Sequence, residues 1–171
     1  MRLFFALWPP EGVRVQLARW SRDLHSLCGG RPTAPQNLHL TLAFLGEVEG
    51  ARVADVGRSA DEVAVPRDSL ALDCPGYWRH NRIVWAGTSS VPAGIGKLAQ
   101  SLREALARHE IGFDPKPFAA HVTLLRNARS PKAMPALEPI QWDVEGFVLA
   151  CSQPQERGGR YETLGSWSAG N

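Results

Sequence analysis

Alternating and helical hydrophobic patterns divide the first part of the chain into a strand, a helix and a second strand. The opening run from Arg2 to Trp8 is apolar over six residues and stops at Pro9-Pro10, which predicts a short buried strand. After these prolines, apolar residues recur at spacings of three and four, which predicts a helix that ends at Gly29-Gly30. The predicted apolar face of this helix comprises Val13, Leu17, Trp20, Leu24 and Leu27. The segment from Leu38 to Gly46 alternates with a period of two and is predicted to be a strand.

The rest of the chain repeats this order with one difference. Helices are predicted over residues 53–63 and 95–105, and strands over residues 69–74, 82–87, 121–124, 144–151 and 160–167. Each strand that contains a histidine follows a proline-containing loop. The segment from Pro131 to Leu137 is broken by prolines where the first half has its second helix. Gly158-Gly159 predicts a turn before the last strand.

The two halves place a His-x-Thr motif at matching positions. His39 follows Arg2 by 37 residues and His121 follows Arg82 by 39, and each interval contains a predicted strand, helix and loop. Such a repeat is best explained by two similar lobes, each marginally stable alone. We therefore predict a single domain over residues 1–171, with the repeat dividing at roughly 1–78 and 79–171. The expected fold class is α+β, bilobal, with two pseudo-symmetric lobes of mainly antiparallel sheet and outer helices around a central cleft.

Composition is that of an ordinary globular protein. The 171 residues are 44% hydrophobic and 21% charged, which excludes a disordered chain. The balance of 19 basic to 17 acidic residues excludes a strongly basic protein that coats duplex nucleic acid, but it permits a basic pocket for a few phosphates. No apolar run approaches the about 20 residues of a membrane span. Three widely spaced cysteines argue against a disulfide framework and favour a cytoplasmic location.

Each motif places one imidazole and one hydroxyl on the same face of a strand, because residues i and i+2 point the same way. These are His39 and Thr41 in the first motif, and His121 and Thr123 in the second. Two imidazoles at neutral pH can share one proton, so one can act as a base and the other as an acid. The hydroxyls can donate to phosphate oxygens on which charge accumulates. The motifs therefore indicate displacement at phosphorus, and a cyclic phosphodiester suits them because its leaving oxygen stays tethered.

A structural role and a metal site are the alternatives for these residues. One His-x-Thr in a strand is usually structural, but two at matching places in a repeat are much rarer by chance. Each motif supplies one histidine, and no Cys, Asp or Glu stands beside it at a ligand spacing, which argues against zinc. Neither a G-x-S-x-G nor a Walker spacing is present. We therefore expect no metal and no other cofactor.

Five segments spread over nearly the whole chain carry a family resemblance. They are residues 2–8, 38–46, 82–87, 117–126 and the ending from Ser152 to Trp167. Together they resemble the two-histidine (2H) phosphoesterases, and among these the RNA 2′,3′-cyclic phosphodiesterases, also called 2′-5′ RNA ligases. The resemblance implies that His39 is the proton donor, that His121 is the proton acceptor, and that Thr41 and Thr123 bind the phosphate.

The resemblance also implies a reaction and a further residue. The expected reaction is hydrolysis of a 2′,3′-cyclic phosphate at an RNA end to leave a 2′-phosphate, and some relatives also join ends through a 2′-5′ bond. Arg126 matches a family position that binds the phosphate. Strict alternation places Arg126 on the strand face opposite His121, so a bulge or a strand end is needed to bring it to the site. Ala120 departs from the family, where proline often precedes the second histidine.

The remaining aromatic and imidazole residues are expected to be structural. Phe44 follows the apolar parity of its strand and Trp20 lies in a helix stripe, so both are predicted to be core residues. His25 and His109 are predicted to lie at the surface. The run from Tyr77 to Arg82 mixes aromatic and charged residues and is predicted to form a loop, with base stacking as an alternative role.

Three functions remain open. The first is metal-independent hydrolysis of RNA 2′,3′-cyclic phosphate ends, with reversible 2′-5′ ligation as an added activity. The second is the same chemistry on a small nucleotide cyclic phosphate, and the third is a non-catalytic nucleotide- or RNA-binding module. Retention of both motifs argues against the third, because binding alone needs no proton-transfer groups. The expected partners are RNA ends or nucleotides with a 2′,3′-cyclic phosphate, with no membrane, and the expected oligomeric state is a monomer.

Overall fold

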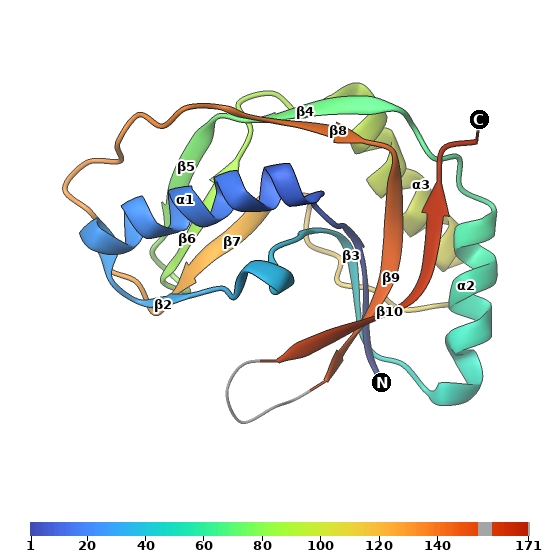
Figure 1. Cartoon of the computed structure of the whole chain (residues 1–171). Coiled ribbons are helices and arrows are strands. Elements are labelled where there is room, and N and C mark those ends of the chain that lie inside the picture. Colours follow the sequence, from blue (N-terminus) through green and yellow to red (C-terminus); the bar gives the residue numbers. More distant parts are fainter. Residues whose placement is uncertain (154–158, 171) are drawn as a thin grey trace.

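Helices and strands alternate along the chain largely as the hydrophobic pattern predicts. The computed structural model describes residues 1–153 and 159–170 (Figure 1). Its strands are β1 (Arg2–Leu7), β2 (Arg31–Pro32), β3 (Leu40–Glu47), β4 (Asp68–Leu72), β5 (Cys74–Trp78), β6 (Ile83–Gly87), β7 (His121–Arg126), β8 (Ile140–Val144), β9 (Gly146–Gln153) and β10 (Arg160–Ser168). Its helices are α1 (Glu11–Cys28), α2 (Val53–Asp61) and α3 (Ala93–Arg108), with short 3-10 helices η1 (Pro35–Asn37) and η2 (Gly50–Arg52). The predicted turn at Gly158-Gly159 begins outside the described residues.

An antiparallel sheet runs through the molecule. Its strand order is β10-β9-β1-β3-β7-β6-β5, with β2 paired to β7, while β4 and β8 form a separate two-stranded sheet. All the strand pairs of the described residues are antiparallel. The prediction of an α+β fold built mainly from antiparallel sheet is therefore confirmed. β3, which follows His39, and β7, which begins at His121, are neighbours in this sheet, and Leu40 pairs with Val122.

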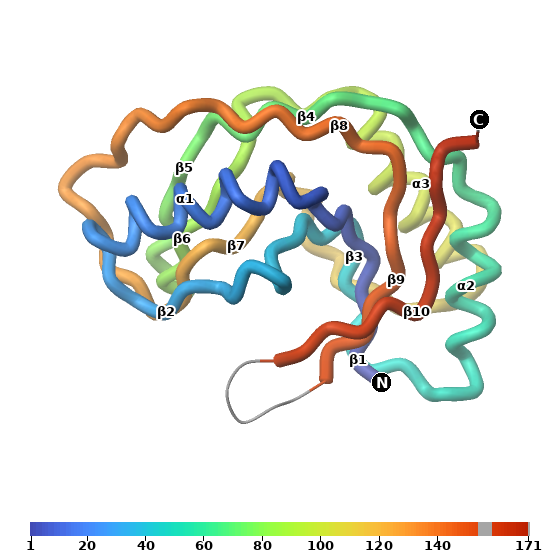
Figure 2. Tube along the Cα trace, in the orientation of Figure 1, coloured from blue at the N-terminus to red at the C-terminus, as the bar shows by residue number. Residues whose placement is uncertain are grey.

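The long helices α1 and α3 each pack on strands from the other half of the chain. α1 follows β1 but packs against β6 and β7, whereas α3 follows β6 but packs against β3 and β4 (Figures 1 and 2). The sequence repeat with its boundary near residue 78 stays a prediction, since the sheet is continuous across both halves. No helix in the described part of the chain is both long enough and apolar enough to span a membrane.

The apolar stripe of α1 is confirmed except at its end. Its buried residues include the predicted Val13, Leu17, Trp20 and Leu24. Leu27, predicted on the same face, is 50% exposed. Cys28, four residues after Leu24, takes the last buried place, so the buried face continues at a spacing of four rather than three.

A bulge interrupts the alternation of β3 and of β7 after the threonine of each motif. The extra residue is Leu42 in β3 and Leu124 in β7, as the shifts of register against β1 and β6 show. In both strands the next residue is also buried, so two apolar side chains follow each other into the core. The bulges therefore place Phe44 on the same strand face as His39, and Arg126 on the same strand face as His121.

Two predicted segments divide differently in the structure. The loop predicted over residues 77–82 is wrong in its first part, because Tyr77 and Trp78 belong to β5 and pair with β6. The single strand predicted over residues 144–151 covers most of β9 together with Val144, the last residue of β8, and the two strands are separated at Glu145. The chain changes sheets at this point, since β8 pairs with β4 whereas β9 pairs with β1.

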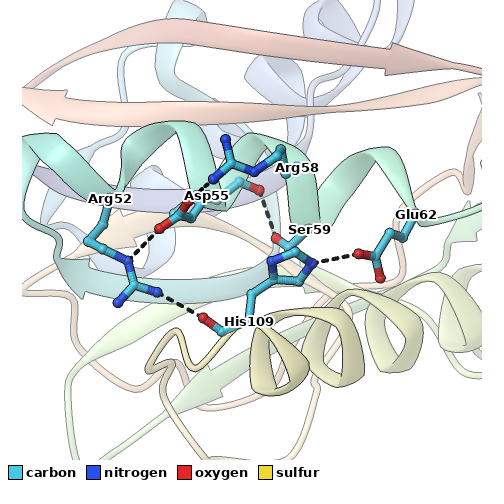
Figure 3. Close-up of polar contacts among 7 residues, drawn as sticks. Arg52, Asp55, Arg58, Ser59, Glu62 and His109 are labelled. Carbon is cyan, nitrogen blue, oxygen red and sulfur yellow. Dashed lines mark hydrogen bonds and ion pairs between the residues drawn. The ribbon is translucent and has the colours of Figure 1, made fainter.

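A polar cluster joins α2 to the end of α3. Arg52 donates to the Asp55 carboxylate at 2.7 Å and to the carbonyl oxygen of His109 at 2.8 Å (Figure 3). His109 in turn contacts Glu62 (Figure 3), and this hydrogen bond, together with one from Arg108, holds the pKa of the Glu62 carboxyl below its usual range. His109 therefore belongs to a helix contact, half-buried rather than freely exposed.

Candidate active site

The two motifs meet in a cleft of about 990 Å³ on one face of the sheet. Because Leu40 pairs with Val122 and the strands are antiparallel, the two His-x-Thr motifs lie side by side and run in opposite directions. The side chains that line the cleft include all four motif residues, His39, Thr41, His121 and Thr123, each of them half-buried. The structure therefore brings together the four residues that the sequence singled out.

Both imidazoles are held by the same kind of backbone hydrogen bond. Nδ1 of His39 lies 2.7 Å from the carbonyl oxygen of Asn37, and Nδ1 of His121 lies 2.7 Å from that of Ala119. A carbonyl oxygen can only accept, so Nδ1 carries the hydrogen in each ring. Nε2 is left to gain or release a proton in both residues.

Three aromatic rings surround the imidazole of His39. Trp8 stacks on it with centroids 5.2 Å apart and planes 9° apart, Phe4 lies at 4.9 Å, and Tyr161 meets it at 5.2 Å and 84°. Burial lowers the pKa of His39 to about 4, the hydrogen bond to Asn37 opposes this shift, and the charge of Arg126 adds to it. In the free protein the His39 side chain is therefore neutral at pH 7.

His121 has a different apolar neighbour, and its pKa is also lowered. Trp78 packs edge-on against its ring at a centroid distance of 4.5 Å. Burial lowers the pKa of His121 below its usual value, the hydrogen bond to Ala119 opposes this, and the charge of Arg126 adds to it. An anion bound in the cleft would raise the pKa of both imidazoles, because negative charge favours the protonated form.

Arg126 lines the cleft because of the bulge at Leu124. The sequence required a bulge or a strand end at this point, and β7 contains the bulge. The side chain is exposed, and its positive charge lowers the pKa of both motif histidines. Arg126 is therefore placed beside the imidazole pair, while its role as a phosphate ligand stays a prediction.

Phe44 was predicted to be a core residue, and this prediction is wrong. The bulge at Leu42 turns its ring onto the cleft face, where it is half-buried and lies beside Phe4. The guanidinium carbon of Arg2 lies 5.2 Å from the centroid of the Phe44 ring. Trp20 is a core residue as predicted, and its indole Nε1 donates to the carbonyl oxygen of Glu138 at 3.1 Å.

Several residues of the cleft wall had not been singled out as part of a site. Arg2 and Phe4 lie on the face of β1 that lines the cleft, but the continuous apolar run of β1 gave no signal of which face that is. Arg31 and Tyr161 reach the cleft through strand pairings that no local pattern indicates. The side chain of Asn37 donates to the carbonyl oxygen of Gly159 at 2.8 Å and so joins η1 to the start of β10.

Two of the other histidines lie outside the cleft. His25 and His109 do not belong to the cleft lining: Nε2 of His25 contacts the carbonyl oxygen of Gly30, and His109 contacts Glu62. Within residues 1–153 and 159–170, no three His, Cys, Asp or Glu side chains come together as a metal-binding group.

The chain is similar over almost its whole length to proteins of known name. A family model described as LigT like Phosphoesterase matches residues 7–85. The chain is 37% identical over 169 residues to RNA 2′,3′-cyclic phosphodiesterase of Escherichia coli (strain K12), covering 98% of this chain and 96% of that protein. It is 34% identical over 181 residues to the protein of the same name from Thermus thermophilus, covering 98% and 90%. A crystal structure of E. coli LigT complexed with 3′-AMP matches with a TM-score of 0.89 at 35% identity, covering 99% of this chain and 98% of the other.

Proposed function

The chain belongs to the LigT-like phosphoesterase family, and we propose that it hydrolyses 2′,3′-cyclic phosphates at RNA ends to 2′-phosphomonoesters. One observation carries the proposal: two imidazoles, each with Nδ1 bound to a backbone carbonyl, line a single cleft together with two threonines and an arginine. Two relatives named RNA 2′,3′-cyclic phosphodiesterase match nearly the full chain, which supports the same substrate class here.

The proposed reaction is an in-line displacement by water. Nε2 of His121 takes a proton from the attacking water as the new P–O bond forms. The bond from phosphorus to the ribose O3′ breaks, and Nε2–H of His39 gives its proton to that oxygen. The product keeps its phosphate on O2′, and each imidazole ends in the protonation state in which the other began.

The polar residues of the cleft would stabilise the charge that develops on phosphorus. The hydroxyls of Thr41 and Thr123 donate to the non-bridging oxygens, and Arg126 binds them through its guanidinium group. The same arrangement explains how His39 becomes an acid. Its pKa is about 4 in the free protein, and the incoming phosphate raises that pKa by adding negative charge beside the ring.

No metal is needed for these steps, since proton transfer and phosphate binding are assigned to side chains of the chain itself. We place the enzyme in the cytoplasm, which the three free thiols favour, and we expect it to act as a monomer. The same acid and base can act with the 5′-hydroxyl of a second RNA end as nucleophile in place of water: O5′ bonds to phosphorus as the P–O3′ bond breaks, which would yield a 2′-5′ linkage.

A short RNA that ends in a 2′,3′-cyclic phosphate tests the proposal. In the presence of EDTA, the wild type should convert it to the 2′-phosphate, and His121→Ala should lose about 10²- to 10⁴-fold in rate. His25→Ala, which changes an exposed imidazole outside the cleft, is the matched control and should keep full activity. Wild-type activity that is lost in EDTA and restored by zinc or manganese would overturn the metal-free mechanism.

A small nucleotide cyclic phosphate is the second candidate substrate. The relative solved as E. coli LigT complexed with 3′-AMP favours it, because a mononucleotide is the ligand of that complex. The two candidates share the chemistry at phosphorus and differ only in what lies upstream of the terminal nucleotide. Relative kcat/KM values for a cyclic mononucleotide and a cyclic-ended oligonucleotide distinguish them.

A further inference from the structure

Arg31 lies beside Arg126 at a place that the proposed reaction does not use. β2 pairs with β7 so that Arg31 is the cross-strand partner of Arg126. Partners in an antiparallel pair share one face of the sheet, with Cα atoms about 5 Å apart. Both arginines accordingly line the same cleft.

The position of Arg31 is set by packed backbone. The two glycines that end α1, Gly29 and Gly30, have φ values of 61° and 82°, which favour glycine. A Cβ on Gly30 would lie 2.5 Å from the carbonyl oxygen of Arg126, so the turn and β7 are in direct contact. The amide of Arg129 also donates to the carbonyl oxygen of Cys28 at 2.8 Å. Arg31 therefore starts from a fixed point next to Arg126, although its side chain is exposed.

The cleft contains more positive charge than one cyclic phosphate requires. Among the described residues, its lining includes Arg2, Arg31, Arg126 and Arg160 and no aspartate or glutamate. None of these four arginines forms an ion pair with a carboxylate of the described residues. A cyclic phosphodiester has a single negative charge, which the positive charges of Arg126 and a protonated imidazole already exceed.

Neighbouring guanidinium groups without anionic partners repel each other, and a second phosphate relieves that repulsion. We propose that Arg31 binds the phosphodiester that joins the terminal nucleotide to the one before it, so that the enzyme favours an RNA end over a mononucleotide. This inference rests on the proposed function, because it requires the cyclic phosphate to lie between His39 and His121.

The volume of the cleft agrees with a substrate of more than one nucleotide. Its volume of about 990 Å³ is at the upper end of the range of about 300–1,000 Å³ for small-molecule sites. Between Arg31 and His39 in the chain, the neutral polar residues Thr33, Gln36 and Asn37 also line the cleft. These residues can contact ribose and base without adding charge, which leaves Arg31 to bind the linking phosphate.

Three substrates separate the linking phosphate from the reacting one. They are adenosine 2′,3′-cyclic phosphate, the dinucleotide ApA with a 2′,3′-cyclic phosphate, and the same dinucleotide with a neutral methylphosphonate linkage. The enzymes are the wild type, Arg31→Gln and the control Arg22→Gln, which changes an exposed arginine of α1 that is not among the cleft-lining residues.

Arg31→Gln should lower kcat/KM for the natural dinucleotide about tenfold, the size of one lost partly exposed contact between guanidinium and phosphate. It should leave kcat/KM unchanged for the mononucleotide and for the methylphosphonate dinucleotide. The wild type should prefer the natural linkage to the neutral one by the same factor, and Arg22→Gln should behave like the wild type. With a longer single-stranded RNA, Arg31→Gln should also reduce the slope of log kcat/KM against log salt by about 0.7.

Two results would overturn the inference and leave the proposed function intact. One is a wild type that hydrolyses the natural and the methylphosphonate dinucleotides equally well. The other is an Arg31→Gln variant that loses as much activity on the mononucleotide, which would place Arg31 at the reacting phosphate. If the wild type hydrolysed none of the three substrates, the proposed function would fail. Calorimetric binding of ApA 2′-phosphate, with natural and neutral linkages, would then still decide whether Arg31 binds the linking phosphate.

Discussion

Protonation of His39 should reduce the stability of the folded protein in mild acid. Its pKa is about 4 in the folded state and takes the ordinary value of 6.5 in the unfolded chain. Between these values the unfolded chain binds the proton and the folded protein does not, so stability falls as the pH falls from 6.5 toward 4. Integration over this window gives a loss of about 2 kcal/mol at pH 5 relative to pH 8.

Urea unfolding of the wild type and of His39→Gln at pH 5 and pH 8 measures this loss. Glutamine does not titrate, and its amide can still donate to a carbonyl oxygen, so the variant removes the proton site with a modest change in shape. The difference in unfolding free energy between wild type and variant should shift by about 2 kcal/mol in favour of the variant at pH 5. His25→Gln, at an exposed imidazole, should produce no such shift.

Inorganic phosphate extends the test to the cleft. At pH 5 it should stabilise the wild type more than it stabilises His39→Gln, because a bound anion raises the pKa of His39 and relieves the penalty. The same pH dependence of unfolding in wild type and variant would mean that the aromatic rings around His39 do not depress its pKa.

Three further predictions concern the rest of the cleft. Arg126→Ala should raise the pKa of His39 and of His121 in an NMR titration, because the charge of Arg126 lowers both values. The variant should also have a lower kcat/KM for every cyclic phosphate, and unchanged pKa values would contradict the placement of Arg126. Gly30→Ala should destabilise the protein by more than about 1 kcal/mol in thermal unfolding, because Gly30 has a positive φ and contacts β7. The control Gly50→Ala, at a glycine with open space around it, should change stability by less than about 0.5 kcal/mol. The pH profile of kcat/KM should be bell-shaped with its maximum below pH 7, since the pKa values of both imidazoles lie below 6.5. A flat profile from pH 5 to 9 would count against acid–base catalysis.

Local periodicity was enough to predict the strands and the faces that present the two motifs. It could not predict the bulges, because when two adjacent residues such as Leu124 and the one after it are both apolar, the pattern does not show which of them continues the alternation. Phe44 was therefore wrongly predicted to lie in the core. For Arg126, the sequence showed only that a bulge or a strand end was needed to bring it to the site. Register shifts depend on the partner strand, and the partner is fixed by tertiary packing.

Strand partners were equally hidden from the sequence. β5 contains Pro75 and Gly76, which usually end a strand, yet it forms the edge of the sheet, where a proline is tolerated. Gly76 has a packing role there, because a Cβ would overlap the ring of Trp85 on β6. Arg31 reaches the cleft only because a two-residue strand pairs with β7, a contact between segments almost a hundred residues apart. Such pairings follow from the whole fold and not from any local pattern.

The assignment of His39 as acid and His121 as base can be tested with a leaving group that needs no proton. A 2′,3′-cyclic phosphate with sulfur in place of the bridging O3′ releases a thiolate, which departs without a general acid. We expect His39→Ala, impaired about 10²- to 10⁴-fold on the oxygen substrate, to recover most of its activity on the sulfur substrate, whereas His121→Ala should stay impaired on both. Recovery of His121→Ala instead would reverse the two roles, and equal impairment of His39→Ala on both substrates would show that His39 is not the acid.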